Sequence, residues 1–571
     1  MNILKINFML LLFLNAFSSA DNRTAQDIGR AVAAKIIRET AFELCDTPLK
    51  PVKSIQVLDY SGLFTSKEKY FFSVSNIFAD KDTSLMFRIS YAGSLCIYIN
   101  DIAVYSGKLS GPAKFKEIAY GMLSFQDTVK IDVNEGKNSI YVELEKNNNP
   151  PVIYLREIPK QVNGSLTARF GLDDFGYKNA SNQWLTMEPL LYSKVRQDIL
   201  SGNETFDMHA EKLHPLQEKT IKKYFIPKSN TYKRESYLEW HYANGTVLMG
   251  LLSLAQALEV PAYQEHVERV INFTVKNYDL FQYQYDSLHA FRTSNYRMFR
   301  KTMLDDTGAP ALPYLQFYLD TLDPKIRFIV DEMGEYVFQE QVRLKDGTFC
   351  RPEPVEMTVW ADDLFMSVPY LVRMGKLTRD KNYYDDAARQ VINFKKYLFN
   401  ENIGLYKHGW FQESNKTSIA YWSRANGWVV WAHTEALLHI PKDHEDYEIL
   451  VSIFKKHIQG LLKYQSETGM WHQILDNPDS FKETSSTAMF ILGILRGVKN
   501  GWIPEQYKEN ALLAWNELKT RIDEDGTVKD ICRGTGIGFD YDFYLNRQRF
   551  DNDPRGLGAV LTAISEIISI N

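Results

Sequence analysis

A polar cluster followed by an apolar run recurs six times after residue 240, at intervals of roughly sixty residues. The clusters begin near Asn244, Asp306, Asp362, Arg424, Glu483 and Asp553. The apolar runs that follow include TVLMGLLSLAQAL, LFMSVPYLV and SSTAMFILGILRG. A regular period of this length indicates a repeated supersecondary unit. We expect each unit to place its polar cluster at the N-terminal end of a buried helix.

A second, amphipathic segment separates most of the apolar runs. These segments cover 260–276, 324–340, 379–398, 444–464 and 503–521. In 379–398 apolar residues recur at helical spacing and charged residues fill the other face, which predicts an amphipathic helix with one solvent-exposed face. The last unit lacks such a segment, and residues 25–44 supply a candidate for it.

The pattern predicts a mainly α protein in which six inner and six outer helices close an (α/α)6 barrel. The alternative is an open helical solenoid, and closure is favoured because the repeats stop at six. In a closed barrel the six polar helix ends would form one pocket on a rigid scaffold. That arrangement is more typical of an enzyme than of a structural protein.

Residues 50–160 alternate apolar and polar side chains, which predicts an antiparallel β-sandwich. Two roles are open for it. One is glycan binding or completion of the active-site rim, and the other is a scaffold or an oligomer contact. The second is favoured because no aromatic cluster in the sequence marks a binding face. The predicted organisation is a signal peptide at 1–20, an N-terminal helix within 21–49, the β-sandwich at 50–160, a connector at 161–235 and the barrel at 236–571.

Length and charge fit a two-domain protein without a nucleic-acid partner. The chain has 571 residues and a net charge of −5, so no basic surface is expected to attract nucleic acid or anionic lipid.

Residues 1–20 combine a lysine, an apolar stretch and a small-residue end, which predicts cleavage after Ala20 and export to a periplasm or the cell exterior. No later apolar run is expected to span a membrane. The four cysteines are too few and too widely spaced to define disulfides or a zinc site.

Acidic residues begin two neighbouring inner helices. Asp362 lies in WADDLFM and Asp306 in MLDDTG, while the next unit begins with WSRANGW. An Asp at a helix start is usually an N-cap. A cap does not need a tryptophan beside it and an arginine in the neighbouring unit, so the three clusters together favour a functional site.

Six ordered motifs carry a family resemblance: WADDLFM, KHGW, WSRANGW, GMWHQILD, ETSSTAMF and DNDPRGLGA. Together they resemble the unsaturated rhamnogalacturonyl hydrolases of glycoside hydrolase family 105, which are related to the unsaturated glucuronyl hydrolases of family 88. The resemblance covers about 235–571 and implies an (α/α)6 barrel, in agreement with the repeat.

The resemblance also implies a reaction on an acidic oligosaccharide left by a polysaccharide lyase. A carboxylic acid protonates C4 of a 4,5-unsaturated uronic acid, water adds at C5, and the hemiketal opens to release the neighbouring sugar. By motif match Asp362 is the acid and then the base. Asp306 would be the second carboxylate, which holds the substrate and acts electrostatically on Asp362.

The predicted substrate-binding residues come from the same motifs. Arg424 would bind the uronate carboxylate as a fork, or it makes a structural ion pair. His408 would bond the sugar or the attacking water, or it is structural. The remaining predicted contacts are Trp360, Trp422, Trp428 and His472, where the indoles offer stacking faces or belong to the core.

Two other functions stay open. The barrel could serve an exo-acting β-glucuronidase on saturated uronides, or the chain could be a glycan-binding protein without catalysis. The retained Asp306 and Asp362 argue against the second. No metal motif or phosphate-binding loop is present in the sequence, so no cofactor is expected.

Overall fold

The computed structural model describes residues 23–48, 55–63, 68–119, 122–158, 161–162, 165–166, 168–171, 184–200, 211–216, 223–229, 236–288, 290, 294–352, 355 and 357–570. The predicted signal peptide lies outside these residues. The chain divides into two compact units. Unit 1 contains the described residues of 1–45, 225–287 and 292–571, and unit 2 those of 46–224 and 288–291.

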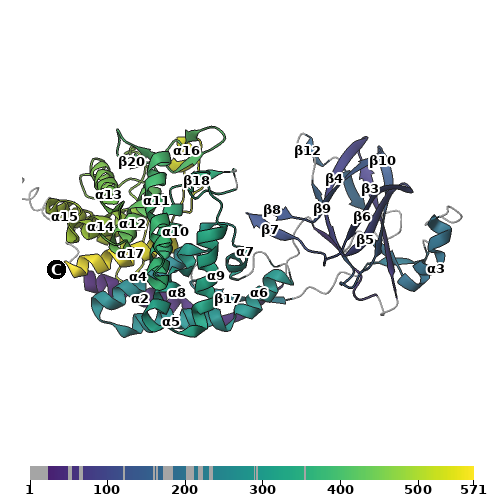
Figure 1. Ribbon diagram of the computed structural model, residues 1–571, viewed down its shortest axis with the longest axis horizontal. Helices are drawn as coiled ribbons and strands as arrows, with labels where there is room; N and C mark the ends of the chain where they lie inside the picture. The colour runs from purple at the N-terminus through teal and green to yellow at the C-terminus, as the bar shows by residue number, and fades with distance from the viewer. Residues whose placement is uncertain are drawn as a thin grey trace, which may run out of the picture. The chain divides into compact units, whose positions relative to one another are not determined.

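Six inner helices of unit 1 begin at or next to the six polar clusters. They are α4 (Tyr242–Leu258), α8 (Gly308–Thr321), α10 (Asp363–Thr378), α12 (Ser423–His439), α14 (Thr484–Lys499) and α17 (Pro554–Ser569). Each helix contacts the next, and α17 contacts α4 (Figure 1). These contacts form a closed row, which an open solenoid would not have.

Each inner helix carries one outer helix. The outer helices are α2 (Ala25–Glu39), α5 (Pro261–Lys276), α9 (Arg327–Glu335), α11 (Lys381–Leu398), α13 (Tyr447–Leu462) and α15 (Lys508–Leu518). The N-terminal α2 packs against α17 and α4 and takes the outer position beside α17. It begins with a capping box between Thr24 and Asp27.

The helix predicted at 25–44 is too long. The backbone of Thr40 is extended, and Thr40–Pro48 forms strand β1, which pairs with β17 (Lys223–Ser229). The segment TAFEL alternates in side-chain character and contains a β-branched and an aromatic residue, both of which favour a strand.

Glycines allow the inner helices to approach closely at their N-terminal ends. A Cβ on Gly245 of α4 would lie 2.3 Å from the carbonyl oxygen of Ala309 in α8. A Cβ on Gly308 would lie 2.0 Å from the carbonyl oxygen of Met366 in α10. Because neither position accommodates a side chain, the polar clusters of these three helices are held close together.

Unit 2 consists of several antiparallel sheets. One has the strand order β16 (Leu213–Pro215), β15 (Leu185–Met187), β3 (Tyr70–Ala79), β10 (Gly136–Glu145), β5 (Gly93–Ile99) and β6 (Ile102–Leu109), with β14 (Ala168–Gly171) also on β3. The other has the order β2 (Gln56–Asp59), β11 (Val152–Ile158), β4 (Thr83–Tyr91) and β9 (Asp127–Val133). Both sheets contribute to one core, for example through Phe87, Leu155, Ile97 and Val142. A hairpin of β7 (Lys116–Ala119) and β8 (Met122–Ser124) and the short pair β12 (Gln161–Val162) and β13 (Ser165–Leu166) complete the described strands of this unit.

Part of the predicted connector belongs to unit 2, so the prediction is wrong there. Strands β14, β15 and β16 join the larger sheet, and helix α3 (Pro189–Leu200) packs on β3. Tyr192 stacks on Phe72 at 4.9 Å, and Arg196 donates to Glu143 at 2.7 Å. Isolated apolar residues in a polar stretch, such as Leu185, are buried here, and their spacing was too irregular to indicate a strand.

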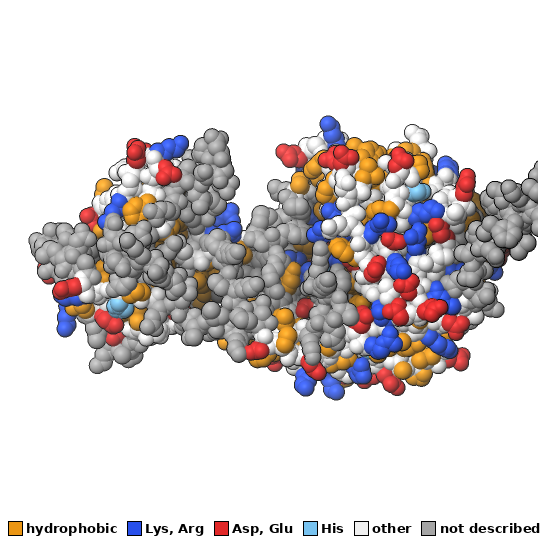
Figure 2. Space-filling model, turned by 180° about the vertical axis from the view of Figure 1, so that it is seen from behind, with side chains coloured by type: hydrophobic (Ala, Val, Ile, Leu, Met, Phe, Trp, Pro, Cys, Tyr) orange, Lys and Arg blue, Asp and Glu red, His pale blue; other side chains and the backbone are white. Residues whose placement is uncertain are grey.

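The surface of unit 1 shows no broad patch of one charge on the face seen in Figure 2, where acidic and basic side chains are interspersed. Among the described helices none combines the length and the apolar character that a membrane crossing requires. All four cysteines are free, with Cys350 and Cys532 buried.

Four histidines, three of them buried and His439 half-buried, make the stability of unit 1 sensitive to acid. Burial lowers the pKa of His266 and of His439 to about 4 and that of His433 to about 3, and it lowers the pKa of His457 well below its ordinary value. The unfolded chain therefore binds more protons than the folded chain below about pH 6.5. This stabilisation is complete above about pH 6.5 and is lost as the pH falls toward 4, at up to about 1.4 kcal/mol per histidine and pH unit.

We expect urea unfolding at pH 5.0 to give a clearly lower free energy of unfolding than at pH 7.5. Tryptophan fluorescence reports mainly on unit 1, because Trp184 alone of the 10 tryptophans lies outside it. Asp363, whose pKa burial raises to about 6, contributes with the opposite sign, as do Asp286, Asp305 and Asp476, whose pKa values burial also raises. His439→Gln should reduce the pH dependence, and equal stability of the unaltered protein at both pH values would contradict the explanation.

Candidate active site

Asp362 lies at the N-cap position of α10 but does not cap it. Its side chain makes no hydrogen bond to the first turn of the helix. By contrast, Asp553 accepts from the Arg555 N–H at the start of α17, and Glu483 accepts from two N–H groups at the start of α14. The ordinary explanation for an acidic residue at a helix start therefore fails for Asp362.

His408 lies beside Asp362. Its Nε2 is 3.3 Å from Oδ2 of Asp362, within ion-pair distance but without hydrogen-bond alignment. Its Nδ1 is 2.9 Å from the Tyr544 hydroxyl, which accepts a hydrogen bond from the Gly538 N–H at 3.1 Å. The side chain of His408 is fully buried, whereas that of Asp362 keeps 14% of its surface exposed. The partly exposed carboxylate of Asp362 thus lies against a buried histidine.

A short strand pair sets this arrangement. Strand β18 (Thr358–Trp360) ends two residues before Asp362, and β21 (Gly409–Phe411) begins one residue after His408. The two strands are antiparallel, with Trp360 opposite Gly409, and β22 (Lys416–Thr417) extends the sheet. The Ala361 N–H also donates to the carbonyl of His408 at 3.0 Å. Two motifs separated along the chain are therefore joined by backbone hydrogen bonds.

Four buried polar atoms of this cluster have no hydrogen-bond partner within the part of the chain that the structure describes. They are Nε1 of Trp360, Oδ2 of Asp362, Nε2 of His408 and Nε1 of Trp422. The ring centroid of His408 is 4.6 Å from that of Trp422 and 5.6 Å from that of Trp360. Buried polar groups are normally paired, and exceptions require an explanation such as a catalytic role. The predicted binding residues Trp360 and Trp422 thus both lie against His408, which contacts the predicted acid.

Asp306 is engaged by another residue. Its carboxylate is fully buried and accepts from Nε and Nη2 of Arg300, both at 2.7 Å. Its carbonyl accepts from the Trp240 indole at 2.7 Å. Asp306 ends the short helix η3 (Leu304–Asp306), so this ion pair fixes the chain just before α8. The geometry favours a positioning role over the predicted contact with substrate.

Asp305, the preceding residue, is the more accessible carboxylate. Its side chain keeps 22% of its surface exposed and lies 3.0 Å from Nη2 of Arg351. The same guanidinium contacts Asp363 at 2.5 Å and lies 4.3 Å above the Trp360 ring. Burial raises the pKa of Asp305, with Arg351 opposing and the neighbouring charges of Asp306 and Asp362 adding to the rise. Arg351 therefore neutralises two acidic residues that flank Asp362.

Arg424 was predicted to bind the uronate carboxylate or to make a structural ion pair, and among the described residues it makes no ion pair and bonds backbone carbonyls instead. Its guanidinium is buried and donates to the carbonyls of Cys532 at 2.5 Å and Arg533 at 2.8 Å. It also lies 4.7 Å above the Trp422 ring. Arg424 thus holds the segment after β23 (Ile531–Cys532), which pairs with β24 (Arg549–Phe550), against α12.

The last two predicted residues lie apart from this cluster. Trp428 is buried between Phe365 at 4.8 Å and Trp431 at 6.0 Å, with Tyr242 at 6.1 Å across its edge. His472 bonds the carbonyl of Ser480 at 2.5 Å, and no contact joins it to Asp362 or His408 among the described residues. Its neighbour Gln473 donates to the Tyr544 carbonyl at 3.0 Å, so the motif GMWHQILD supports the site through Gln473.

Three residues of the site were missed from the sequence. Asp305 lies inside a recognised motif, but its neighbour Asp306 has the same side chain, so the sequence did not single it out. Arg351 follows an outer helix, and Tyr544 lies on the short helix α16 (Tyr541–Leu545). Neither position repeats between units, so no periodic signal could have found them.

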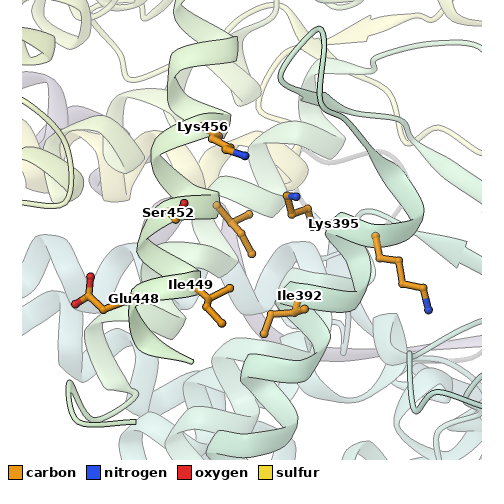
Figure 3. A pocket seen from close by; sticks show the side chains of 8 residues that line it. Ile392, Lys395, Glu448, Ile449, Ser452 and Lys456 are labelled. Atoms are coloured by element: carbon orange, nitrogen blue, oxygen red, sulfur yellow. The ribbon is translucent and has the colours of Figure 1, made fainter. Parts of the chain in front are cut away.

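A groove of about 520 Å³ lies elsewhere, between the outer helices α11 and α13 (Figure 3). Isoleucines form its floor and lysines its rim. Lys395 and Lys456 pair with Glu401, and Lys396 pairs with Asp346 at 2.8 Å. The three lysines of the groove are thus all paired. The groove lies between outer helices, whereas Asp362 lies at the start of an inner helix.

Unit 1 has the fold of glycoside hydrolases of family 105. A family 105 glycoside hydrolase from C. acetobutylicum ATCC 824 aligns with a TM-score of 0.52 and 22% identity, over 58% of this chain and 94% of that one. A possible family 105 member from Klebsiella pneumoniae aligns with the same TM-score of 0.52 and 22% identity, over 62% of this chain and 87% of that one. At this identity the likeness establishes the fold alone.

The chain belongs to glycosyl hydrolase family 88, whose family model matches residues 217–570. It is 28% identical over 255 residues to the unsaturated rhamnogalacturonyl hydrolase YesR of Bacillus subtilis, covering 44% of this chain and 71% of that protein. It is 29% identical over 218 residues to an unsaturated 3S-rhamnoglycuronyl hydrolase of Alteromonas, covering 37% of this chain and about half, 51%, of that protein. The predicted family resemblance is confirmed, and the protein is an unsaturated glycuronyl hydrolase by class.

Proposed function

We propose that this protein removes a 4,5-unsaturated uronic acid from the non-reducing end of lyase-generated oligosaccharides, within an (α/α)6 barrel that carries an accessory β-sandwich. The observation that carries the proposal is the state of Asp362. Its carboxylate does not cap α10, keeps part of its surface exposed and lies 3.3 Å from a buried histidine. The names of two relatives, both hydrolases of unsaturated glycuronyl substrates, support the same substrate class.

In the proposed reaction Asp362 enters protonated and gives its proton to C4 of the sugar. Water attacks C5 and gives a proton back to the Asp362 carboxylate, which restores the acid. The product is a hemiketal at C5, and its ring C5–O bond then breaks to give a C5 ketone. The freed oxygen leaves a hemiacetal at C1, which collapses to an aldehyde and releases the neighbouring sugar with the glycosidic oxygen.

Neighbouring side chains fit supporting roles in this reaction. His408 holds its Nε2 toward Asp362 while Tyr544 fixes the other ring nitrogen. The indole N–H groups of Trp360 and Trp422 are donors for the sugar. Asp305 and Asp363 lie beside Asp362 and share the Arg351 guanidinium, so these three side chains set the charge around the proposed acid.

Location and assembly also belong to the proposal. The pattern of residues 1–20 supports export to a periplasm or the cell exterior. The β-rich unit is proposed to serve as a scaffold or an oligomer contact.

The test follows absorbance and isotope labels together. Unsaturated uronides absorb in the near ultraviolet through a double bond conjugated with the carboxylate, and hydration destroys that conjugation. We expect absorbance to fall in step with release of the neighbouring sugar, with solvent deuterium at C4 and heavy oxygen from water at C5. Turnover of saturated glucuronides with the oxygen label at C1 would replace the proposal with an exo-acting β-glucuronidase.

A further inference from the structure

An exposed aromatic ring lies on the segment that supports the active site. Phe539 is 72% exposed, the most exposed of the large apolar residues in the described part of the chain. Its ring stacks on Phe411, with centroids 5.2 Å apart and planes at 26°. Phe411 is 7% exposed, so one ring is anchored in the protein and the other offers a free face. An apolar ring held open to solvent by a buried partner is a candidate contact for a ligand.

Both rings are tied by short contacts to the residues around Asp362. Phe411 lies in β21 opposite Thr358, in the same strand pair that sets His408 beside Asp362. Phe539 follows Gly538, whose N–H donates to the Tyr544 hydroxyl that contacts His408. Along this path the Cα of Phe539 lies no more than about 17 Å from the Asp362 carboxylate, given ordinary covalent dimensions.

Packing and hydrogen bonds fix the segment that carries Phe539. A Cβ on Gly409 would lie 2.1 Å from Cδ1 of Ile537, so glycine at this place lets Ile537 pack against β21. Arg424 donates to the carbonyl of Arg533 at the other end of the segment, and Arg547 donates to the carbonyl of Gly534. The ring is therefore fixed by contacts on both sides although its own surface is open.

We propose that Phe539, backed by Phe411, is the stacking platform for the sugar released from the unsaturated uronic acid. The inference rests on the proposed function, since it places that sugar beside the residues that hold Asp362. A pyranose presents a face of C–H bonds that packs on an aromatic ring, while its hydroxyls stay in water. Phe539 would then contribute to recognition of the leaving sugar without touching the reacting C4–C5 bond.

The experiment compares two substrates that share one unsaturated uronic acid. One is a lyase-generated disaccharide, and the other is the methyl glycoside, which has no second sugar. Phe539→Ala should raise KM for the disaccharide about three- to tenfold, the effect of one aromatic contact, with little change for the methyl glycoside. Phe539→Tyr should restore the disaccharide KM, because it keeps the ring. Phe328→Ala, at a 43% exposed phenylalanine on the outer helix α9, should change neither substrate.

Two outcomes overturn the proposal: an equal change for both substrates, or an unchanged KM for the disaccharide. Failure of the proposed function has a different signature, because the unaltered enzyme would then turn over neither unsaturated substrate. In that case a saturated glucuronate disaccharide and its methyl glycoside test Phe539 by the same comparison.

Discussion

Asp362→Asn is expected to lower kcat by about 10²- to 10⁴-fold on an unsaturated uronide while the protein stays folded. The amide has nearly the same shape as the acid but cannot deliver a proton to C4. The fold should tolerate the change because the carboxylate caps no helix N–H and keeps 14% of its surface exposed. Sugar release, measured alongside the melting temperature and the circular dichroism spectrum, checks both parts of the expectation.

Asp380→Asn is the matched control for this variant. Asp380 lies at the corresponding position of the outer helix α11, where it accepts from the Asn382 N–H and acts as an N-cap. Asparagine caps a helix about as well as aspartate, so activity and stability should both persist. An Asp362→Asn enzyme that retains more than about a tenth of the original activity would remove Asp362 from the role of acid.

The repeat in the sequence was enough to predict most helices of unit 1. Each polar cluster marked the start of an inner helix, because a buried helix must be apolar along its length and polar at its end. The same signal located Asp362, whose motif lies at a helix start. It did not distinguish Asp305 from Asp306, since two adjacent carboxylates have the same pattern and only the fold pairs one with Arg300.

Contacts between distant segments could not be predicted in this way. His408 meets Asp362 because β18 pairs with β21, and these strands have only three residues each. Arg424 was predicted to bind the uronate carboxylate with two N–H groups, because arginine often binds carboxylates in this way. Its N–H groups instead donate to the carbonyls of residues 532 and 533, more than a hundred positions away. Short strands and loop carbonyls leave no periodic pattern, so tertiary structure alone decides these partners.

Arg351→Met is expected to destabilise unit 1 by about 3–5 kcal/mol, because it removes the cation between buried carboxylates. The side chains of Arg351 and Asp363 are 3% and 1% exposed, so water cannot replace the lost contact. Adding Asp363→Asn should recover part of the stability, since the amide carries no charge that needs a partner. Urea unfolding of the two single variants and the double variant measures this coupling.

The same variant should move the activity optimum to higher pH, which a purely structural role would not do. Arg351 lowers the pKa of Asp305 and of Asp363, so its removal keeps both acids protonated to higher pH, and the dependence of kcat on their charge moves to higher pH with them. Arg373→Met is the control, because Arg373 forms a comparable buried pair with Glu435 at 2.8 Å in the second half of α10. It should lower stability but leave the pH profile of kcat in place. If both variants keep the pH profile of the unaltered enzyme, Arg351 is only a structural ion pair. A shift confined to Arg351→Met would mean that its charge acts on the carboxylates around Asp362 during turnover.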